Sequence, residues 1–431
     1  MTRNLLLLQL RAQLNKLSGK TRMTLVLWSG AALVGVIAVM LAKMADWFFA
    51  GFHTLTERWF WWPLLSLPLG AVLIRWLMVR IGQGSEGSGI PQALAALQQT
   101  EQADSAERLL SFRIVLAKFL GIVLGVGSGF VLGREGPTVQ IGAALMYSMR
   151  KLVPLHTAAF RRHLILAGGA AGIAAAFNTP LAGIVFAFEE LSRSIENTTS
   201  GRTIGAVILA GMISLALLGN YTYFGRIHVP TFSFTVLIPM VLIAGVAGVI
   251  GGLFSWMCVN QRRWLPGNVI RLRSQYPYRF VALCGLAVAL CGLVAPIYGS
   301  GALETSQVIS GHGDMGLMYL PMKFIGLTAT FLTGLPGGIF APSLSLGAGL
   351  GSWFVPLFPA DLNIKIVALG MVAMLAAVTR APITSAIIMI EMTDGHVMVI
   401  SMLGAAMIAS GVASMFRTHL YQDLAKQFLP K

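Results

Sequence analysis

Apolar residues run in long blocks along this chain, and short polar segments separate the blocks. A straight helix needs about 20 mostly apolar residues to cross the hydrocarbon core of a bilayer. Several blocks reach that length, so the pattern predicts an all-α polytopic membrane protein. The apolar blocks cover residues 24–50, 61–80, 111–132, 137–149, 164–190, 204–219, 234–259, 280–298, 320–357, 364–392 and 397–416.

Glycine and proline shorten or divide many of these blocks. The block that starts at Pro137 meets Arg150 and Lys151 too early for a full crossing. Broken or short helices are tolerated at membrane depth only where they face protein or a water-filled cavity. The pattern therefore indicates a transport pathway built from tilted and broken helices, not a simple anchor.

Two halves of the chain repeat the same motifs in the same order. The matched segments are 118–121 with 323–326, 133–137 with 338–342, 87–89 with 299–301, and Pro180 through Glu189 with Pro382 through Glu391. Paired broken segments in matching halves are typical of secondary transporters and mark their binding site. The pattern leaves open whether the repeats are parallel or inverted.

The repeat predicts a simple organisation of the chain. Residues 23–219 form the first membrane repeat and residues 220–425 the second. The basic segment 1–22 is expected to be an amphipathic helix on the cytoplasmic surface, and 426–431 a short C-terminal tail. No soluble regulatory domain is expected.

Composition narrows the class of protein. Apolar residues make up 56% of the 431 residues and charged residues only 11%, against about 25% in soluble proteins. This excludes a soluble enzyme, and it means that the net charge of +15 does not indicate a nucleic-acid partner. Instead, the positive-inside rule places the basic clusters, and with them both termini, in the cytoplasm, so an even number of crossings is expected. The basic clusters lie near the N-terminus, at 150–162, at 262–279 and in the C-terminal tail, while Glu101, Asp104 and Glu107 are interpreted as a solvated connection.

The three cysteines give no sign of a metal site. Cys258, Cys284 and Cys291 lack a C-x-x-C spacing and a neighbouring histidine. They are interpreted as small packing residues, and no metal or cofactor is expected.

Four glutamates stand inside apolar blocks, where an ionisable side chain is costly and points to function. They are Glu135, Glu189, Glu190 and Glu391. Glu135 precedes Pro137, a residue suited to the first turn of a helix. Its carboxylate would lie at a helix N-terminus, where free N–H groups attract either a carboxylate or a mobile anion. A carboxylate that leaves on protonation would make a proton-gated anion site; the competing interpretation is a plain N-terminal charge paired with Arg134.

Two glycine-rich breaks could supply the remaining ligands of an anion. Ser88 offers a hydroxyl after the first break, and Ile339 and Phe340 offer backbone N–H groups after the second. The partial charges of hydroxyl and N–H groups suit conduction, because they bind the anion weakly enough for it to leave again. Lys118 and Lys323 would raise the local anion potential at longer range. The alternatives are an ordinary N-cap for Ser88 and lysines that snorkel toward the interface.

Together these motifs resemble the CLC family of chloride channels and proton-coupled chloride transporters, in particular its short bacterial branch. The resemblance is carried by segments 87–91, 133–137 and 337–342 and by Tyr421, and it spans nearly the whole chain. It implies an inverted-repeat fold and a homodimer with one pore in each subunit. It also implies a multi-pass protein of the bacterial inner membrane that acts on chloride and protons and can serve as an electrical shunt in acid resistance.

The resemblance also implies roles for individual residues. Ser88 and Tyr421 would coordinate chloride through their hydroxyls, with the backbone N–H groups of Gly136, Ile339 and Phe340. Glu135 would be the gating carboxylate and would also carry the proton. Glu190 would be the internal proton-transfer residue, and its presence favours an antiporter. Glu189 and Glu391 are expected to be structural and bound to helix ends or arginines.

Three other functions compete with chloride/proton antiport. A passive voltage-gated chloride channel would have the same pore. A cation transporter would more naturally offer carboxylates and carbonyls than helix N-termini. An intramembrane enzyme is disfavoured, because the chain has no H-E-x-x-H motif and no serine-protease motif.

Overall fold

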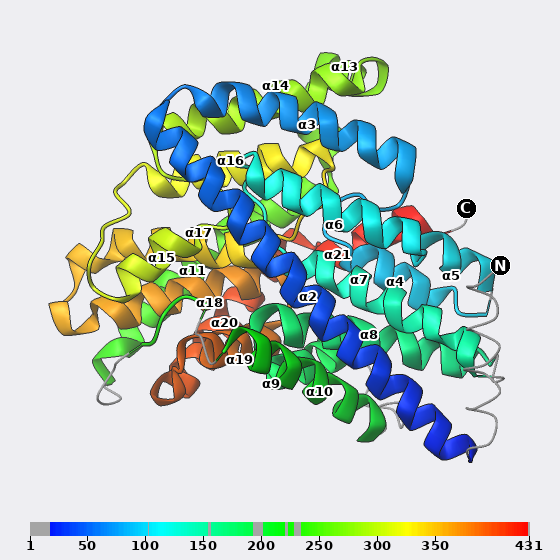
Figure 1. Ribbon diagram of the computed structural model, residues 1–431. Helices are drawn as coiled ribbons and strands as arrows, with labels where there is room; N and C mark the ends of the chain where they lie inside the picture. The colour runs from blue at the N-terminus through cyan, green and yellow to red at the C-terminus, as the bar shows by residue number, and fades with distance from the viewer. Residues whose placement is uncertain are drawn as a thin grey trace.

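The computed structural model describes residues 18–101, 103–153, 157–192, 201–219, 223–227 and 234–429, and these residues are almost entirely helical (Figure 1). The first half of the chain forms α2 (Gly19–Arg58), α3 (Trp62–Ile81), α4 (Ile90–Gln98), α5 (Ala103–Leu109), α6 (Phe112–Gly127), α7 (Glu135–Ser148), α8 (Ala158–Phe177), α9 (Pro180–Phe186) and α10 (Gly201–Leu218). The second half forms α11 (Leu237–Val259), α12 (Gln261–Trp264), α13 (Gly267–Gln275), α14 (Pro277–Val294), α15 (Ala302–Ile309), α16 (Tyr319–Thr333), α17 (Phe340–Phe354), α18 (Asn363–Thr379), α19 (Pro382–Thr393), α20 (Val399–Ala413) and α21 (Leu420–Ala425). Eight helices within these ranges are long and apolar enough to cross a membrane, which agrees with a multi-pass protein.

The expected N-terminal helix 1–22 falls mostly on residues 1–17, which lie outside the described residues. Residues 19–22 are the first turn of α2, which starts after the N-cap Ser18. At the other end, Lys426–Phe428 forms a 3₁₀ turn, and the carbonyl of Phe428 accepts a hydrogen bond from Gln99 Nε2 at 3.0 Å.

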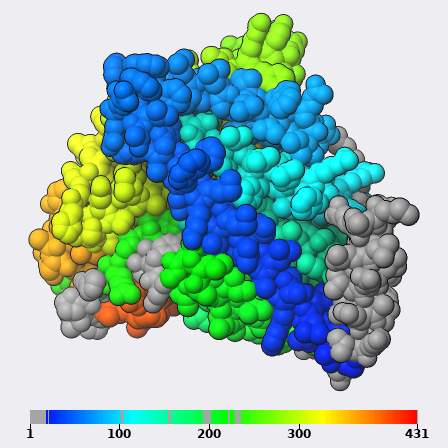
Figure 2. Space-filling view, in the orientation of Figure 1, coloured from blue at the N-terminus to red at the C-terminus, as the bar shows by residue number. Residues whose placement is uncertain are grey.

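Helix α2 crosses the whole face shown in Figures 1 and 2, between α3 on one side and α10 on the other. One of its sides packs inward through buried residues such as Leu27 and Leu41. Its other side exposes large apolar residues along its length, among them Trp28, Met40 and Trp47. A helix that is apolar all round and exposed on one side is suited to contact lipid.

Three apolar blocks of the sequence prove to be pairs of helices. Block 320–357 divides into α16 and α17, block 164–190 into α8 and α9, and block 364–392 into α18 and α19. The last two breaks are built alike: α8 ends on Asn178 and α18 on Arg380, both left-handed, and a proline opens the following helix. Proline is suited to that first position because its missing N–H has no partner there anyway.

The two repeats are inverted, which answers the question that the residues left open. Helices α7 and α17 begin at one point, where Gly133 and Gly338 exchange two backbone hydrogen bonds of 2.8 and 2.7 Å. From this point the helices run apart, α7 to the right of Figure 1 and α17 to the left. Matching helices that point in opposite directions are what an inverted repeat requires.

Glycines allow α7 and α17 to pack closely against the neighbouring helices. A Cβ on Gly142 of α7 would lie 2.2 Å from the carbonyl oxygen of Gly168 in α8. In the second repeat, Gly347 of α17 approaches Gly370 of α18 in the same way, with 2.3 Å for the corresponding distance. Some of the glycines therefore serve close helix packing, which is common within membranes.

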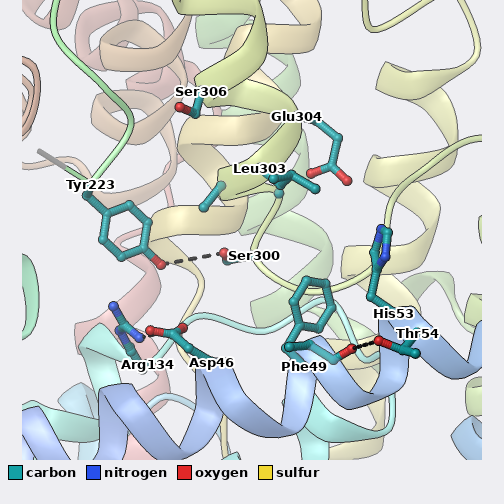
Figure 3. A pocket seen from close by; sticks show the side chains of 13 residues that line it. Asp46, Phe49, His53, Thr54, Arg134, Tyr223, Ser300, Leu303, Glu304 and Ser306 are labelled. Carbon is teal, nitrogen blue, oxygen red and sulfur yellow. Dashed lines mark hydrogen bonds and ion pairs between the residues drawn. The ribbon is translucent and has the colours of Figure 1, made fainter.

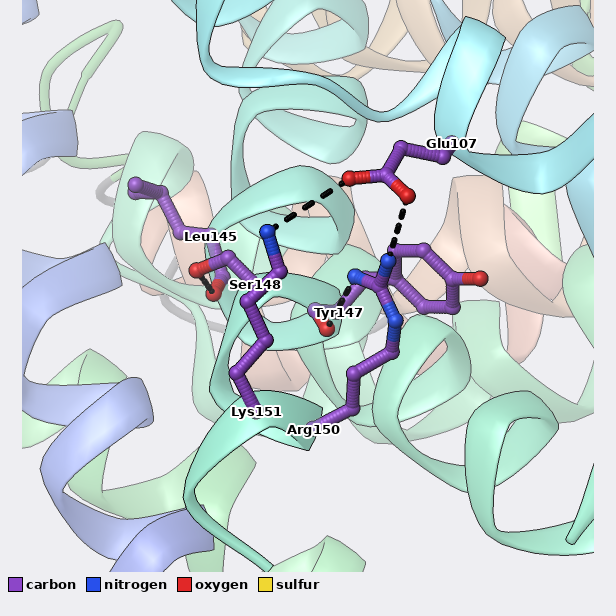
Figure 4. A network of polar contacts seen from close by, with 6 residues as sticks. All are labelled: Glu107, Leu145, Tyr147, Ser148, Arg150 and Lys151. Carbon is purple, nitrogen blue, oxygen red and sulfur yellow. Dashed lines mark hydrogen bonds and ion pairs between the residues drawn. The ribbon is translucent and has the colours of Figure 1, made fainter. Parts of the chain in front are cut away.

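The expected solvated loop around Glu107 is instead ordered as α5, and it supplies an acid to a basic cluster. The Glu107 carboxylate accepts from Arg150 Nη2 at 2.7 Å and lies 3.6 Å from the ammonium of Lys151 (Figure 4). The guanidinium of Arg150 also lies 4.0 Å from the centre of the Tyr147 ring. The cluster at 150–151 has no acid near it in the sequence, but the fold brings one from 43 residues away.

Candidate functional site

The helices α4, α7, α17 and α21 converge at the middle of the molecule. Besides the Gly133–Gly338 pair, Gly87 donates to the carbonyl of Gly334 and accepts from the N–H of Gly337, at 3.2 and 3.1 Å. The three glycine-rich breaks of the sequence therefore lie against one another. This arrangement brings together every residue that the motifs suggested for anion binding.

Ser88 lies directly over the start of α7. A Cβ on Gly136 would be 2.2 Å from Ser88 Oγ, so only glycine leaves room for the hydroxyl there. The following residue, Gly89, adopts φ +98° and opens α4, a backbone conformation that glycine adopts without strain. Ser88 is 5% exposed, and its side chain does not cap α4.

Tyr421 of α21 lies at the same point. Its ring lies 6.0 Å from that of Phe340, the first residue of α17. Its hydroxyl faces Ser88 Oγ, but the two groups do not reach ordinary hydrogen-bond geometry. Ile339 and Phe340 are both buried, and their N–H groups stand at the start of α17.

Glu135 is the first residue of α7 and is fully buried. Its carboxylate lies against Gly133, where a Cβ would be 2.2 Å from Oε2, and it faces the backbone N–H groups at the starts of α7 and α17. Neither carboxylate oxygen has a hydrogen-bond partner among the described residues. Arg134 forms an ion pair with Asp46 at 2.9 Å, and its charge also acts on the Glu135 carboxylate.

The centre therefore contains buried polar groups that have no partner in the described part of the chain. Both oxygens of Glu135, Ser88 Oγ and Tyr421 Oη are buried and unpaired within the described residues. Each such group costs free energy unless a ligand satisfies it. The two hydroxyls and the two helix N-termini can donate hydrogen bonds to a small anion. The carboxylate can take up a proton.

The two matched lysines do not snorkel. Lys118 and Lys323 are fully buried, and their ammonium groups lie beside the Gly-Ser-Gly loops of their own repeats. Lys118 donates to Gln140 Oε1 at 2.6 Å, and Lys323 donates to the carbonyls of Ile297 and Gly299 at 2.8 and 3.2 Å. Lys323 therefore bonds directly to the loop of its own repeat, whereas Lys118 acts through Gln140, which donates to the carbonyl of Gly84.

Glu190 is the second buried acid that acts electrostatically on Tyr421, besides Glu135. It is 2% exposed, stands in the π-helical turn Ala187–Ser192, and interacts electrostatically with the Tyr421 hydroxyl. It also borders a cavity of about 420 Å³ that Arg162, Gln422 and Lys426 help to line. Glu190 thus lies between an accessible cavity and the central cluster.

Glu189 and Glu391 are helix caps, as the spacing of the repeats suggested. Glu189 accepts from the N–H groups of Ile383 and Thr384 at 3.0 and 2.6 Å, at the start of α19. Glu391 accepts from those of Leu181 and Ala182 at 3.2 and 2.7 Å, at the start of α9. Each repeat therefore caps a helix of the other.

Two groups of polar residues beside the site are not apparent from the motifs of the sequence. Gln140 links Lys118 to the carbonyls of Gly84 and Leu109, at 3.1 and 2.9 Å. Asp46 forms an ion pair with Arg134, and its one signal in the sequence is that it is an acid inside the apolar block 24–50. Among the described residues, no three His, Cys, Asp or Glu side chains gather into a possible metal site.

Comparison with known proteins gives consistent matches over the whole fold. Residues 70–414 match the family described as voltage gated chloride channel. A protein of Klebsiella pneumoniae named H(+)/Cl(−) exchange transporter ClcA is 30% identical, over 92% of this chain and 87% of its own. A Vibrio vulnificus protein of the same name is 31% identical, over 86% of this chain and 83% of its own.

Solved structures agree in fold. The crystal structure of a slow cyanobacterial Cl⁻/H⁺ antiporter aligns with a TM-score of 0.78 at 23% identity, covering 94% of this chain and 97% of the other. That of a CLC-type fluoride/proton antiporter aligns with a TM-score of 0.76 at 21% identity, covering 92% and 96%.

Proposed function

This chain belongs to the voltage-gated chloride channel family, and from that membership we propose that it exchanges chloride for protons across the inner membrane of a bacterium. It is a transporter and not an enzyme. The observation that carries the proposal is the unpaired carboxylate of Glu135, buried beside the unpaired hydroxyls of Ser88 and Tyr421. One buried centre thus offers ligands to an anion and a carboxylate that can take up a proton.

Chloride binds where α7 and α17 begin. The hydroxyls of Ser88 and Tyr421 and the N–H groups of Gly136, Ile339 and Phe340 donate to it. These donors carry partial charges, so the ion is held without being trapped. Lys118 and Lys323 raise the anion potential from behind the loops.

Glu135 competes with chloride for the same N–H groups. When it is ionised, its carboxylate occupies the start of α7 in place of the anion. When it is protonated, its attraction to the helix N-terminus falls, and the side chain leaves the path. Because the gate opens by accepting a proton, anion movement and proton movement become linked.

Glu190 exchanges protons with the cavity of about 420 Å³ that it borders. Glu135 and Ser88 do not line this cavity, so the proton enters at a different place from the anion. The nearest alternative, a passive channel, would need no acid there. The relatives in Klebsiella pneumoniae and Vibrio vulnificus are named as exchange transporters, which favours antiport over the passive channel.

A reversal-potential measurement tests antiport directly. The purified chain is placed in liposomes under opposed chloride and pH gradients. A reversal potential that moves with the pH gradient is expected, because coupled exchange carries both ions. A potential set by chloride alone would refute antiport and leave the passive channel.

The role of Glu190 is tested by Glu190→Gln. Chloride flux should remain while uphill proton pumping is lost, because the amide cannot carry a proton. Glu189→Gln, the adjacent cap, is the matched control and should retain pumping. If Glu190→Gln still pumps protons, this residue is not on the proton path.

The assembly consists of two copies with one pore in each. The paired helices α9 and α19 and the neighbouring α10 and α20 expose large apolar side chains, including Leu181, Met212, Ile383, Ile400 and Met407. A second copy would cover this face, and mass measurement in detergent tests the dimer.

The side with Arg150, Arg161 and Lys426 is cytoplasmic, and with it both termini. In the inner membrane, the exchanger serves as an electrical shunt during acid stress.

A further inference from the structure

A second cavity lies beside the start of α7, on the side of Arg134. It has a volume of about 580 Å³ and is lined by residues of α2 and α15 and of the loops that carry Tyr223 and Ser300 (Figure 3). The hydroxyl of Tyr223 points to Ser300 Oγ at 3.5 Å, and the guanidinium of Arg134 lies 5.3 Å from the centre of the Tyr223 ring. Two hydroxyls and one cation thus meet at this side of the cavity.

The repeat relates this pair of hydroxyls to the pair at the centre. Ser300 is the middle residue of Gly299-Ser-Gly301, as Ser88 is of Gly87-Ser-Gly89. Tyr223 follows α10 as Tyr421 follows α20, with the two tyrosines 198 positions apart and the two helices starting 198 positions apart. Because the repeats are inverted, the second pair lies on the opposite side of the membrane midplane.

A row of aromatic rings connects the two tyrosines. Tyr223 packs edge-on against Phe177, which stacks on Phe340, and Phe340 contacts Tyr421, with ring centres 6.0–6.1 Å apart at each step. The carboxylate of Glu135 interacts electrostatically with both tyrosine hydroxyls. The gate therefore lies between two equivalent pairs of hydroxyls.

We propose that Tyr223, Ser300 and Arg134 form a second site for a small monovalent anion, at which chloride is held between the cavity and the Glu135 gate. This site rests on the proposed function. It differs from the central site in having a full positive charge and in being open to the cavity.

Asp46 acts as a competitor at this site. The cavity is also lined by Asp46, Glu304 and His53, so its acids oppose an anion as its bases attract one. The side chain of Asp46 is 71% exposed, whereas that of Arg134 is 8% exposed. An arriving anion can therefore take the place of Asp46 on Arg134, while Asp46 turns to water at little cost.

The first experiment locates the anion in the natural chain. Crystals of the full-length protein are soaked in bromide, and anomalous density is expected between Tyr223 Oη and Ser300 Oγ. The density should be absent in the Tyr223→Phe/Ser300→Ala double variant. Density that is absent from the natural chain, or that persists in the double variant, overturns the proposal.

The second experiment measures exchange of radiolabelled chloride in liposomes at equal chloride on both sides. The double variant should need about 3- to 10-fold more chloride for half-maximal exchange, since two hydrogen bonds to the anion are lost. Asp46→Asn should need less chloride than the natural chain. Ser306→Ala removes a hydroxyl from the same cavity but away from Arg134, and it should change nothing (Figure 3).

The two proposals fail separately. Suppose that the natural chain exchanges chloride for protons, and that the double variant and Ser306→Ala both need the same chloride concentration as the natural chain. The second site is then refuted, while the antiport proposal stands. If bromide binds as expected but no proton coupling is found, the antiport proposal fails while the site stands.

Discussion

Glu135 and Glu391 both place a carboxylate at the start of a broken helix, but their surroundings differ. Glu391 accepts two hydrogen bonds from the first N–H groups of α9, and Glu189 does the same for α19. The oxygens of Glu135 are buried and have no such bonds among the described residues. A satisfied carboxylate stabilises the fold, whereas an unsatisfied one is available for exchange with another anion or for protonation.

The difference has a geometric cause. Glu189 and Glu391 reach across from the other repeat, so their carboxylates meet the helix starts along the direction of the free N–H groups. Glu135 belongs to the helix whose start it occupies, and its carboxylate lies against Gly133 of the preceding loop. Stability and gating therefore fall to different glutamates: Glu189 and Glu391 stabilise helix starts, and Glu135 is left as the movable group.

The largest expected effect is that of Glu135→Gln. Chloride flux should lose its response to pH and proton pumping should stop, because the gate can no longer ionise. The free energy of unfolding should not fall, since a buried carboxylate without partners is removed. Flux is measured in liposomes across a pH series, and unfolding is followed in detergent.

Glu57→Gln is the control for this change, because Glu57 is exposed on α2 and pairs only with a surface histidine in the part of the chain described. It should leave both flux and stability unchanged. A Glu135→Gln protein that keeps a normal pH response would remove Glu135 from the gate.

A smaller effect is expected from Ser88→Ala and Tyr421→Phe. Each removes one hydroxyl donor, so half-maximal chloride exchange should need about 2- to 10-fold more chloride. Stability should be unaffected, because neither hydroxyl has a partner among the described residues. Ser414→Ala, at an exposed hydroxyl, is the control. Unchanged chloride dependence in both variants would exclude them as ligands.

The caps should behave in the opposite way. Glu391→Ala removes two hydrogen bonds at the start of α9 and should lower the free energy of unfolding by about 1–2 kcal/mol. The ratio of chloride to protons should be preserved in the protein that remains folded. Thermal unfolding and the reversal potential report these two quantities. A changed ratio with unchanged stability would reverse the assignment of roles.

The smallest expected effect is the coupling between the two caps. Glu189 and Glu391 join the same pair of helices, so removal of one loosens the contact that the other stabilises. In a double-mutant cycle with Glu189→Ala, the two losses should differ from additivity by about 0.5 kcal/mol. Strict additivity would show that the caps act independently.

Much of this architecture could be predicted from the residues. The glycine and proline positions located the breaks before α4, α7 and α17, because few other residues suit those backbone conformations. The spacing of motifs revealed the repeat, and the rarity of acids pointed to Glu135 and Glu190. Both acids are buried and both interact electrostatically with Tyr421, but their roles stay predictions.

Several features could not be predicted because they depend on residues far apart in the chain. Asp46 and Arg134 are 88 positions apart, and Glu391 lies 210 positions from Leu181. The similarity of Tyr223 to Tyr421 becomes visible only when the matching helices α10 and α20 are known. Sequence patterns show which residue types occur at which spacing, but not which partner a side chain meets.

The sequence by itself determined the membrane class, the positions of the helix breaks and the presence of two repeats, because these follow from local hydropathy, backbone preference and spacing. The tertiary structure alone decided that the repeats are inverted and that α7 and α17 begin at one point. It also decided which glutamates find hydrogen bonds. The physical reason is that a buried polar group acquires its role from the donors and charges around it, and in this fold those come from the other half of the chain.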